Sequence, residues 1–258
     1  MSLFDFEETF GEDYLHFYLP DMSEERNAAE AAEIADVLGD PVSLTGPADR
    51  GGNTRAAILD VPCGHGRITN LLANRGYAMT GLDASQLFLD KARADATDQR
   101  VEVDYILGDM RELPWRDPKF DAVVCWFTSF GYFDDDDNRR VLGEFRRALR
   151  PGGTLVLETM HHDGFVRMLA PRSSIGTAVG DDHLIDVVRF DPVSGRIETD
   201  RTVIRGGSVR RSHHSVRIPT APELIDWLHD AGFAVVSATD RRGAPLTIES
   251  RRLLVVAT

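Results

Sequence analysis

The fold is decided by the stretch AILDVPCGHGRIT at residues 57–69, in which an apolar strand runs directly into a glycine-bearing loop. Glycine lets the backbone approach a ligand closely, because it tolerates positive φ and carries no side chain. The helix after such a loop points unpaired N–H groups and the positive end of its dipole at an anionic part of the ligand. The pair Gly64 and Gly66 alone fits many adenine-containing ligands.

On the C-terminal side of this stretch, apolar strands alternate with helical patterns. The expected strands are residues 57–61, 78–83, 101–108, 120–127 and 154–159. A helix is expected over 136–149, with acids in its first turn, arginines in its last turn and Pro151-Gly152-Gly153 at its end. The alternation predicts an α/β fold with a doubly wound, mainly parallel sheet.

The two ends of the chain have other patterns. A helix is expected over 21–38, followed by a linker over 39–53. Residues 183–218 alternate β-branched and polar side chains around two turns, which predicts a three-stranded antiparallel meander. A capping box from Thr220 to Glu223 opens a further helix, and strands over 233–239 and 252–257 are expected to close the sheet as an antiparallel hairpin.

These elements divide the chain into three parts. We expect residues 1–53 to form an N-terminal helical lid or cap, and residues 54–160 together with 219–258 to form the doubly wound domain. Residues 161–218 are expected to form a small antiparallel β insert, as a wall of the substrate pocket or as a dimer face.

Composition narrows the possible partners and compartment. The 258 residues carry a formal net charge of -13, which disfavours a nucleic-acid backbone or an anionic membrane surface as the main partner. Two cysteines, Cys63 and Cys125, give no disulfide framework and fit a reducing cytoplasm. The acidic N-terminus does not resemble a signal peptide, and no apolar run is long enough to span a bilayer. We therefore expect a soluble cytoplasmic protein.

Polar residues follow the second and third strands. Asp83 ends the second strand, 17 positions after Gly66 (83 − 66), where a doubly wound fold places the carboxylate that accepts the ribose hydroxyls. The alternative is a simple helix cap, although Ser85 can supply that cap and leave Asp83 free. Asp109 and Met110 follow the third strand, where they suit the amine and the face of an adenine. The ends of parallel strands converge at one edge of the sheet.

With these landmarks the chain resembles a class I S-adenosylmethionine-dependent methyltransferase of the small-molecule type, similar to amine and amino-sugar N-methyltransferases. Residues 120–124 and 149–154 match the family as well. The resemblance implies S-adenosylmethionine as cofactor and S-adenosylhomocysteine as product. It implies cofactor contacts from Asp60, Pro62, Gly64, Gly66, Arg67, Asp83, Ala84, Asp109, Met110, Trp126 and Tyr18.

One residue departs from the family pattern. Pro62 stands where the family usually has glycine, and it removes one backbone N–H donor from the loop. Asp60 has two interpretations: its charge suits an ammonium or sulfonium centre, or it holds N–H groups of the loop.

The acceptor region is expected after the fourth strand, in the aromatic and mostly neutral run from Cys125 to Phe133. It lacks the Asn or Asp, Pro-Pro-Tyr type of motif of DNA adenine methyltransferases. The predicted substrate residues are Phe127, Thr128, Ser129, Tyr132 and His214. The alternative interpretation places Trp126 or Phe130 in the core.

Histidines and acids supply further candidates. His161 and His162 follow the fifth strand and are the candidate catalytic bases. On a strand His213 and His214 face opposite sides, so one of them at most faces the acceptor. The acids at 134–137 fit a helix start better than a metal site, and we expect no metal.

Two groups of residues allow two interpretations each. Tyr14, Phe17, Tyr18 and Arg26 resemble a lid over the cofactor, or they belong to an ordinary surface helix. The insert is rich in arginine, which either binds an anionic acceptor or, as we favour, solvates an exposed sheet. These arginines are Arg189, Arg196, Arg201, Arg205, Arg210, Arg211 and Arg217.

The sequence thus predicts methyl transfer to nitrogen or oxygen of a small-molecule acceptor, with a homodimer as a possible assembly. One alternative is a non-catalytic protein that binds S-adenosylmethionine or S-adenosylhomocysteine. Another is a nicotinamide-dependent oxidoreductase, for which Gly64, Gly66 and Thr69 form a partial fingerprint without its third glycine.

Overall fold

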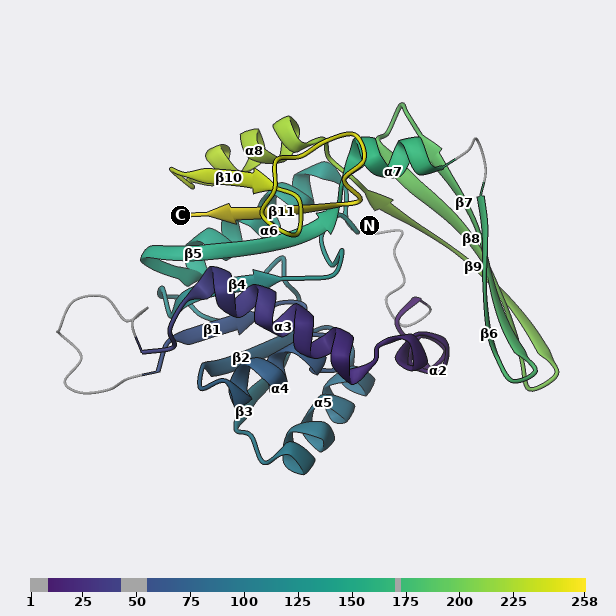
Figure 1. Cartoon of the computed structure of the whole chain (residues 1–258), viewed down its shortest axis with the longest axis horizontal. Coiled ribbons are helices and arrows are strands. Elements are labelled where there is room, and N and C mark those ends of the chain that lie inside the picture. The colour runs from purple at the N-terminus through teal and green to yellow at the C-terminus, as the bar shows by residue number, and fades with distance from the viewer. Residues whose placement is uncertain (1–8, 43–54, 170–172) are drawn as a thin grey trace.

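The part of the chain that the structure describes folds into two β-sheets, a large one flanked by helices and a smaller one beside it (Figure 1). The computed structural model describes residues 9–42, 55–169 and 173–258, so most of the expected linker lies outside the described residues. Within these ranges the large sheet has seven strands in the order β10-β11-β5-β4-β1-β2-β3.

The strands from β1 to β5 are parallel, and their order reverses at β1 as a doubly wound fold requires. They are β1 (Ala57–Asp60), β2 (Ala78–Asp83), β3 (Val103–Leu107), β4 (Phe120–Cys125) and β5 (Leu149–Met160). β10 (Val236–Thr239) and β11 (Arg252–Ala257) form an antiparallel hairpin, and β11 also pairs antiparallel with β5. The predicted fold class and C-terminal hairpin are confirmed.

Helices cover both faces of the large sheet. Ile58 and Leu59 are consecutive on β1 and enter different core clusters, because side chains alternate along a strand. On the Ile58 face lie α3 (Glu24–Leu38) and α4 (Arg67–Asn74), with α5 (Gln86–Gln99) against β3. On the Leu59 face lie α6 (Asp135–Ala148) and α8 (Ala221–Asp230).

Capping residues fix where these helices begin. Ser85 caps α5, Asp134 caps α6, and Thr220 forms the predicted capping box with Glu223 at α8. The helix predicted from residue 21 begins later, at Glu24, because the short 3-10 turn η1 (Leu19–Asp21) precedes it and Ser23 accepts the N–H of Arg26. That boundary was wrong by one turn.

β5 begins earlier than predicted. The strand starts at Leu149, directly after α6, and includes Pro151-Gly152-Gly153. Gly152 has a φ of 76°, and the pairing with β4 shifts between Phe120 and Ala122, so the extra residues are accommodated in an irregular stretch of the ladder. The proline and glycines therefore end the helix as predicted but do not delay the strand.

In the described part of the chain the smaller sheet has four antiparallel strands rather than the predicted three. They are β6 (Ser173–Val179), β7 (Asp182–Asp191), β8 (Arg196–Arg205) and β9 (Ser208–Arg217). The sequence prediction missed β6, an edge strand of small and polar residues with little burial. The two predicted turns join β7 to β8 and β8 to β9.

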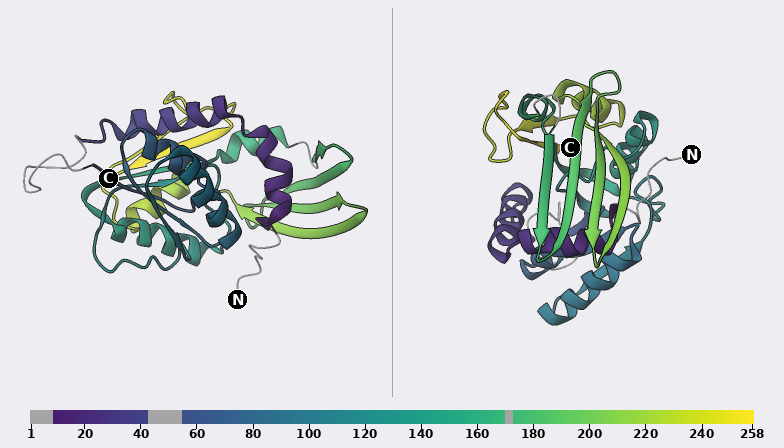
Figure 2. Two further views of the ribbon diagram at one scale, coloured as in Figure 1. Left: turned by 90° about the horizontal axis from the view of Figure 1, so that it is seen from below. Right: turned by 90° about the vertical axis from the view of Figure 1, so that its right-hand side faces the viewer.

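Two short helices pack on the inner face of the smaller sheet, the face turned toward the large sheet (Figure 2). α2 (Glu12–Tyr18) contributes Phe17 to a cluster with Leu184 and Val203. α7 (His162–Met168) packs against Val188 and Ile197 near the other end of the strands. Together they connect the smaller sheet to the large one.

Candidate functional site

A pocket with an empty volume of about 890 Å³ lies where β1, β2, β3 and β4 end. Its lining includes twelve of the residues predicted for cofactor or substrate: Asp60, Pro62, Gly64, Arg67, Asp83, Ala84, Asp109, Met110, Trp126, Phe127, Ser129 and Tyr132. It also includes Phe10, Cys63, His65 and Phe88, for which no contact with cofactor or substrate was predicted, and Phe133 at the end of the predicted acceptor region. The strand ends therefore converge as expected.

The two glycines of the loop after β1 have different roles. Gly64 has a φ of 55° and lines the pocket, and a Cβ there would meet no atom within 4 Å. Gly66 has a φ of 77° and is the N-cap of α4. A Cβ at Gly66 would lie 2.7 Å from the Cβ of Ala92 and would also overlap the hydroxyl of Tyr105. Gly64 thus leaves space for a ligand, and Gly66 permits close packing.

Asp83 is buried at the end of β2 and organises this loop. Its Oδ2 accepts the N–H of Gly64 at 2.8 Å and its Oδ1 accepts the N–H of Ser85 at 2.9 Å. Ser85 caps α5 as predicted. The carboxylate of Asp83 nevertheless also accepts the two local backbone hydrogen bonds just described. Burial raises the pKa of Asp83 to about 6, although these backbone donors favour its charged form.

Asp60, at the end of β1, is also buried. Its Oδ2 accepts the hydroxyl of Thr69 at 2.6 Å. Burial raises the pKa of Asp60 to about 7, so the site holds two carboxyls whose ionised forms favour a positively charged ligand. Thr69 occupies the position where the oxidoreductase fingerprint has a glycine, and here its side chain fixes Asp60.

Asp109 and Met110 line the pocket next to the end of β3. Arg111 donates to Asp109 through its backbone N–H at 2.8 Å and through Nη2 at 2.7 Å. Burial alone would raise the pKa of Asp109, but the bonds from Arg111 hold the pKa below its ordinary value. Met110 is buried and presents a polarisable thioether to the pocket.

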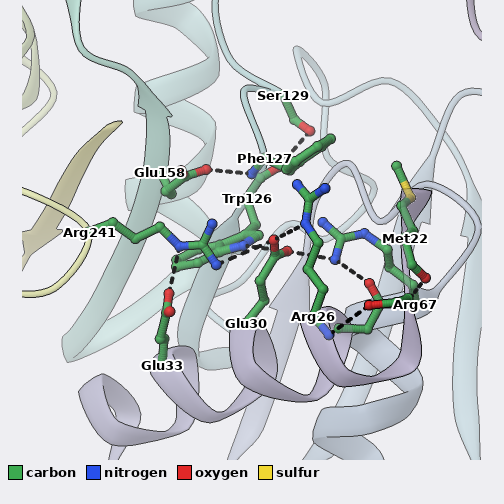
Figure 3. Close-up of polar contacts among 12 residues, drawn as sticks. Met22, Arg26, Glu30, Glu33, Arg67, Trp126, Phe127, Ser129, Glu158 and Arg241 are labelled. Carbon is green, nitrogen blue, oxygen red and sulfur yellow. Dashed lines mark hydrogen bonds and ion pairs between the residues drawn. The ribbon is translucent and has the colours of Figure 1, made fainter. Parts of the chain in front are cut away.

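A cluster of arginines around one buried glutamate supports the pocket wall (Figure 3). Glu30 of α3 pairs with Arg67 at 2.6 Å, with Arg26 at 3.1 Å and with Arg241 at 3.3 Å. Trp126 donates its indole N–H to Glu30 at 3.3 Å. Glu30, which lies on α3, therefore holds two pocket-lining residues in place: Arg67 at the start of α4 and Trp126 directly after β4.

This cluster carries excess positive charge beside the pocket. Its ion pairs join three arginines to Glu30 and Glu33, so the formal charge is +1 (3 − 2). The guanidinium of Arg67 also lies 4.9 Å from the ring centroid of Phe127. In a chain of net charge -13, such a local excess suits a carboxylate on the ligand.

The loop after β4 has a strained backbone. Phe127 and Thr128 have φ values of 63° and 59°, in the left-handed region that side-chain-bearing residues rarely occupy. Buried Glu158 of β5 holds this conformation, since its Oε2 accepts the N–H of Phe127 at 2.9 Å and its backbone carbonyl accepts the N–H of Thr128 at 3.2 Å. Arg252 of β11 pairs with the same carboxylate.

Aromatic rings form the remaining wall. Phe10 contacts Tyr132 with their ring centroids 5.3 Å apart, and Tyr14 of α2 stacks on Tyr18 with centroids 4.8 Å apart. Burial raises the pKa of Tyr14 to about 12, and it also raises the pKa of Tyr132. This part of the pocket is therefore apolar with neutral hydroxyl groups.

Some predicted residues do not line the pocket. Gly66 lies behind it against Tyr105, and Tyr18 lies behind Tyr14. Thr128 belongs to the strained loop, and its side chain is absent from the lining. His214 lies on the inner face of the smaller sheet, beside Thr199 of β8.

The two candidate bases also lie outside the lining. Nδ1 of His161 contacts the carbonyl oxygen of Ser250 at 2.9 Å, and Nδ1 of His162 contacts Asp163 at 2.7 Å. Their positions after β5 agree with the prediction, but both imidazoles are engaged with these neighbours. This geometry gives the catalytic assignment no support.

The arginines of the smaller sheet do not simply solvate it, so the favoured interpretation was wrong for three of them. Arg201 and Arg217 are buried. Arg217 binds Glu223 of α8 at 2.8 Å, and Arg196 donates to the carbonyl of Phe133 at 2.9 Å. These side chains fasten the smaller sheet to the rest of the molecule.

Of the acids at 134–137, Asp134 caps α6 as expected, whereas Asp135 pairs with Arg217 and Asp137 pairs with Arg111. Asp134 Oδ1 accepts the N–H of Asp137 at 2.9 Å. Across residues 9–42, 55–169 and 173–258, no group of three or more His, Cys, Asp and Glu residues is arranged to hold a metal ion. In the same ranges no helix combines the length and apolar character needed to cross a bilayer.

The donor set fits S-adenosylmethionine. Asp83 offers a buried carboxylate for ribose hydroxyls, and Gly64 leaves space where a side chain would point. Asp109 and Met110 suit the adenine, and the arginine excess beside Arg67 suits the methionine carboxylate.

Comparisons with known proteins agree with this assignment. A family model described as a methyltransferase domain matches residues 58–153. Demethylmenaquinone methyltransferase of Renibacterium salmoninarum is 33% identical over 186 residues, 72% of this chain and 70% of that protein. The cypemycin N-terminal methyltransferase of a Streptomyces species is 27% identical over 202 residues, 77% of this chain and 81% of that protein. The CcbJ methyltransferase of Streptomyces caelestis shares the fold, with a TM-score of 0.72 at 21% identity over 90% of this chain and 88% of that chain.

Proposed function

Because this chain belongs to the S-adenosylmethionine-dependent methyltransferases, we propose that it methylates a nitrogen or oxygen atom of a small-molecule acceptor. The observation that carries the proposal is the composition of one pocket. Residues suited to the cofactor, such as Asp83 and Met110, share that pocket with an aromatic wall that includes Phe127 and Tyr132. An uncharged aromatic wall suits a compact organic acceptor rather than a phosphate backbone.

The cofactor, when bound, would supply an electrophilic methyl group on a sulfonium sulfur; the acceptor lone pair would form a bond to the methyl carbon as the carbon–sulfur bond breaks, with S-adenosylhomocysteine as the leaving group. The residues of this chain then have to position the acceptor and exclude water. Tyr14 and Tyr132 are our candidates for this role, since both line the pocket and both are half-buried.

Transfer to an amine needs no strong base, because a neutral amine already carries the lone pair and loses its proton after the transfer. Neither His161 nor His162 is among the residues that line the pocket, which favours such an acceptor. A general base from either histidine stays a prediction. Relatives carry both chemistries in their names, an N-terminal methyltransferase and a ubiquinone biosynthesis O-methyltransferase.

The proposal extends to partners. The net charge of -13 argues against nucleic acid as the substrate. We assign the part from 161 to 218 as a wall of the acceptor pocket, because the inner face of its sheet packs on α2, which carries Tyr14. Use of the outer face in a homodimer stays a prediction that sedimentation analysis tests.

The test is a turnover screen against amines, phenols and carboxylic acids, with mass detection of a methyl gain. We expect methylated amines or phenols, and loss of turnover in Asp83→Ala with the fold retained. A thermal-shift assay with S-adenosylhomocysteine and NAD is the control. Stabilisation by S-adenosylhomocysteine without turnover of any panel member would contradict the proposal and favour a non-catalytic binding protein.

A further inference from the structure

One arginine behind the pocket contacts two of the residues that line it. Arg111 follows Asp109 by two positions and does not itself line the pocket. Its guanidinium pairs with Asp109, and its Cζ lies 4.3 Å from the ring centroid of Phe133. Asp109 and Phe133 both line the pocket, and they come from two different loops, one after β3 and the other after β4. Arg111 therefore links two separate parts of the pocket wall.

The N–H groups of Arg111 use most of the accepting capacity of the Asp109 carboxylate. Oδ1 accepts the backbone N–H of Arg111 at 2.8 Å, and Oδ2 accepts Nη2 at 2.7 Å. The Nε–H is shared between the two oxygens, at 3.1 Å from Oδ1 and 3.0 Å from Oδ2. A carboxylate offers about four accepting positions, and these three N–H groups occupy three of them. The remaining position can accept one N–H of a ligand.

Arg111 is also held from a third direction, by α6. Its Nη1 donates to Asp137 in the first turn of that helix at 2.8 Å. An isolated ion pair on the surface contributes little, because both side chains stay free to move. Here two carboxylates and one aromatic ring restrain the same guanidinium. The forked contact from this restrained group fixes the orientation of the Asp109 carboxylate.

The surroundings of Asp109 favour a flat apolar ring that carries a hydrogen-bond donor at its edge. The bonds from Arg111 hold the pKa of Asp109 below its ordinary value, so the carboxylate is ionised at pH 7 and can only accept. Leu82, Met110 and Phe133 line the same pocket and belong to one apolar cluster. The adenine of the cofactor is such a ring, and its 6-amino group is such a donor.

We infer that Arg111 is a positioning residue that orients Asp109 toward the 6-amino group of adenine, so that the pocket distinguishes adenine from a purine without this amine. Asp109 makes the contact with the cofactor, and Arg111 acts through Asp109. This inference rests on the proposed function, because it takes the pocket to be the cofactor site.

Two ligands that differ in one group test the inference. They are S-adenosylhomocysteine and its analogue with purine in place of adenine, which lacks only the 6-amino group. Isothermal titration calorimetry on the full chain measures both dissociation constants. We expect the unaltered protein to bind S-adenosylhomocysteine about tenfold more tightly than the analogue, because the analogue leaves an ionised acceptor without its donor.

The preference should fall to about twofold in Arg111→Met, because a carboxylate that is no longer oriented forms a weaker bond to the amine. Loss of the contact between Arg111 and Phe133 weakens both ligands alike, since both contain the purine ring. The ratio of the two dissociation constants therefore reports the orientation of Asp109 and not the packing of the pocket wall.

Arg139→Met is the matched control. Arg139 also pairs with an aspartate, Asp230, at 2.8 Å, and its Cζ lies 4.7 Å from the ring centroid of Trp227, but none of these three residues lines the pocket. This variant should keep the tenfold preference. If Arg111→Met does not fold, Asp137→Asn takes its place, because it frees the guanidinium from α6 and leaves its other bonds intact. The preference should then fall to about fivefold.

The outcomes separate the inference from the proposed function. Equal weakening of both ligands in Arg111→Met, no preference in the unaltered protein, or an unchanged preference in Asp137→Asn where that variant is the one used overturns the inference. Binding of neither ligand overturns the inference and the proposed function together. The expected pattern without turnover of any acceptor in the screen supports the role of Arg111 and contradicts the proposed acceptor chemistry.

Discussion

Two buried carboxyls make cofactor affinity depend on pH. Burial raises the pKa of Asp83 to about 6 and that of Asp60 to about 7, and only an ionised Asp83 can accept from both ribose hydroxyls. We therefore expect the Kd for S-adenosylmethionine to be about fourfold weaker at pH 5.5 than at pH 8 from Asp83 alone. Isothermal titration calorimetry across this range measures the change.

The unfolding free energy of the cofactor-free protein should fall as pH rises, whereas the affinity for the cofactor should increase. An acid whose pKa is raised by folding contributes stability at low pH and loses it as pH rises through the folded pKa, here about 6. Asp83→Asn serves as the control, since it removes this titration and should flatten the pH dependence of both quantities. An equally steep binding profile in Asp83→Asn would remove the ribose assignment.

The two loop glycines should respond differently to alanine. Gly66→Ala brings a Cβ against Ala92 and Tyr105 in a left-handed backbone, so we expect a loss of about 2–4 kcal/mol in unfolding free energy. Gly64→Ala meets open space, and only the backbone strain of about 1–2 kcal/mol applies. Its main effect should be weaker cofactor binding, because the new methyl group enters the pocket. Urea unfolding and calorimetry on both variants separate the two effects.

Residues at strand ends were predictable because their position follows from the parallel sheet. Asp83, Asp109 and Met110 line the pocket as expected. The support that Glu30 gives to the pocket wall and the bond from Arg201 to Tyr18 were not predicted, because the partners are remote in sequence: Trp126 is 96 positions from Glu30, and Tyr18 is 183 positions from Arg201. No local sequence pattern predicts pairs that lie this far apart in the chain.

At the scale of elements, Glu158 is expected to hold the loop after β4 in its strained form. Its side chain is fully buried, and it binds both the N–H of Phe127 and Arg252. Glu158→Ala leaves Arg252 without its partner and should cost about 3 kcal/mol of unfolding free energy. Denaturant unfolding checks the value. The exposed pair of Arg167 and Glu249 is the control, and Glu249→Ala should change stability by less than about 1 kcal/mol.

Periodicity predicted most elements but failed at edges and joints. β7, β8 and β9 alternate more buried with less buried residues over parts of their length, and all three were predicted as strands. β6 is an edge strand whose residues are mostly exposed, so its sequence carries no burial pattern. The strained turn at Phe127 also leaves no trace in the sequence, because the bonds that stabilise it come from β5.

At the scale of the whole molecule, α2 connects the two sheets at the pocket. Its Phe17 packs against Leu184 and Val203 of the smaller sheet, and its Tyr14 lines the pocket next to the large sheet. A lid-like role for this segment was a prediction from resemblance. The arrangement supports that prediction, because α2 packs on the smaller sheet while its Tyr14 lines a pocket at the edge of the large sheet.

The connection through α2 predicts that a change in the smaller sheet's core reaches the cofactor. Phe17→Ala removes a fully buried ring and should lower the unfolding free energy by roughly 3–5 kcal/mol. Because a loosened α2 no longer holds Tyr14 over the pocket, the Kd for S-adenosylmethionine should also rise, although Phe17 itself does not line the pocket. Val193→Ala, at a side chain 94% exposed in the turn after β7, is the control for both measurements. A destabilised Phe17→Ala protein with unchanged Kd, measured at a temperature where it is still folded, would show that α2 anchors the smaller sheet without closing the site.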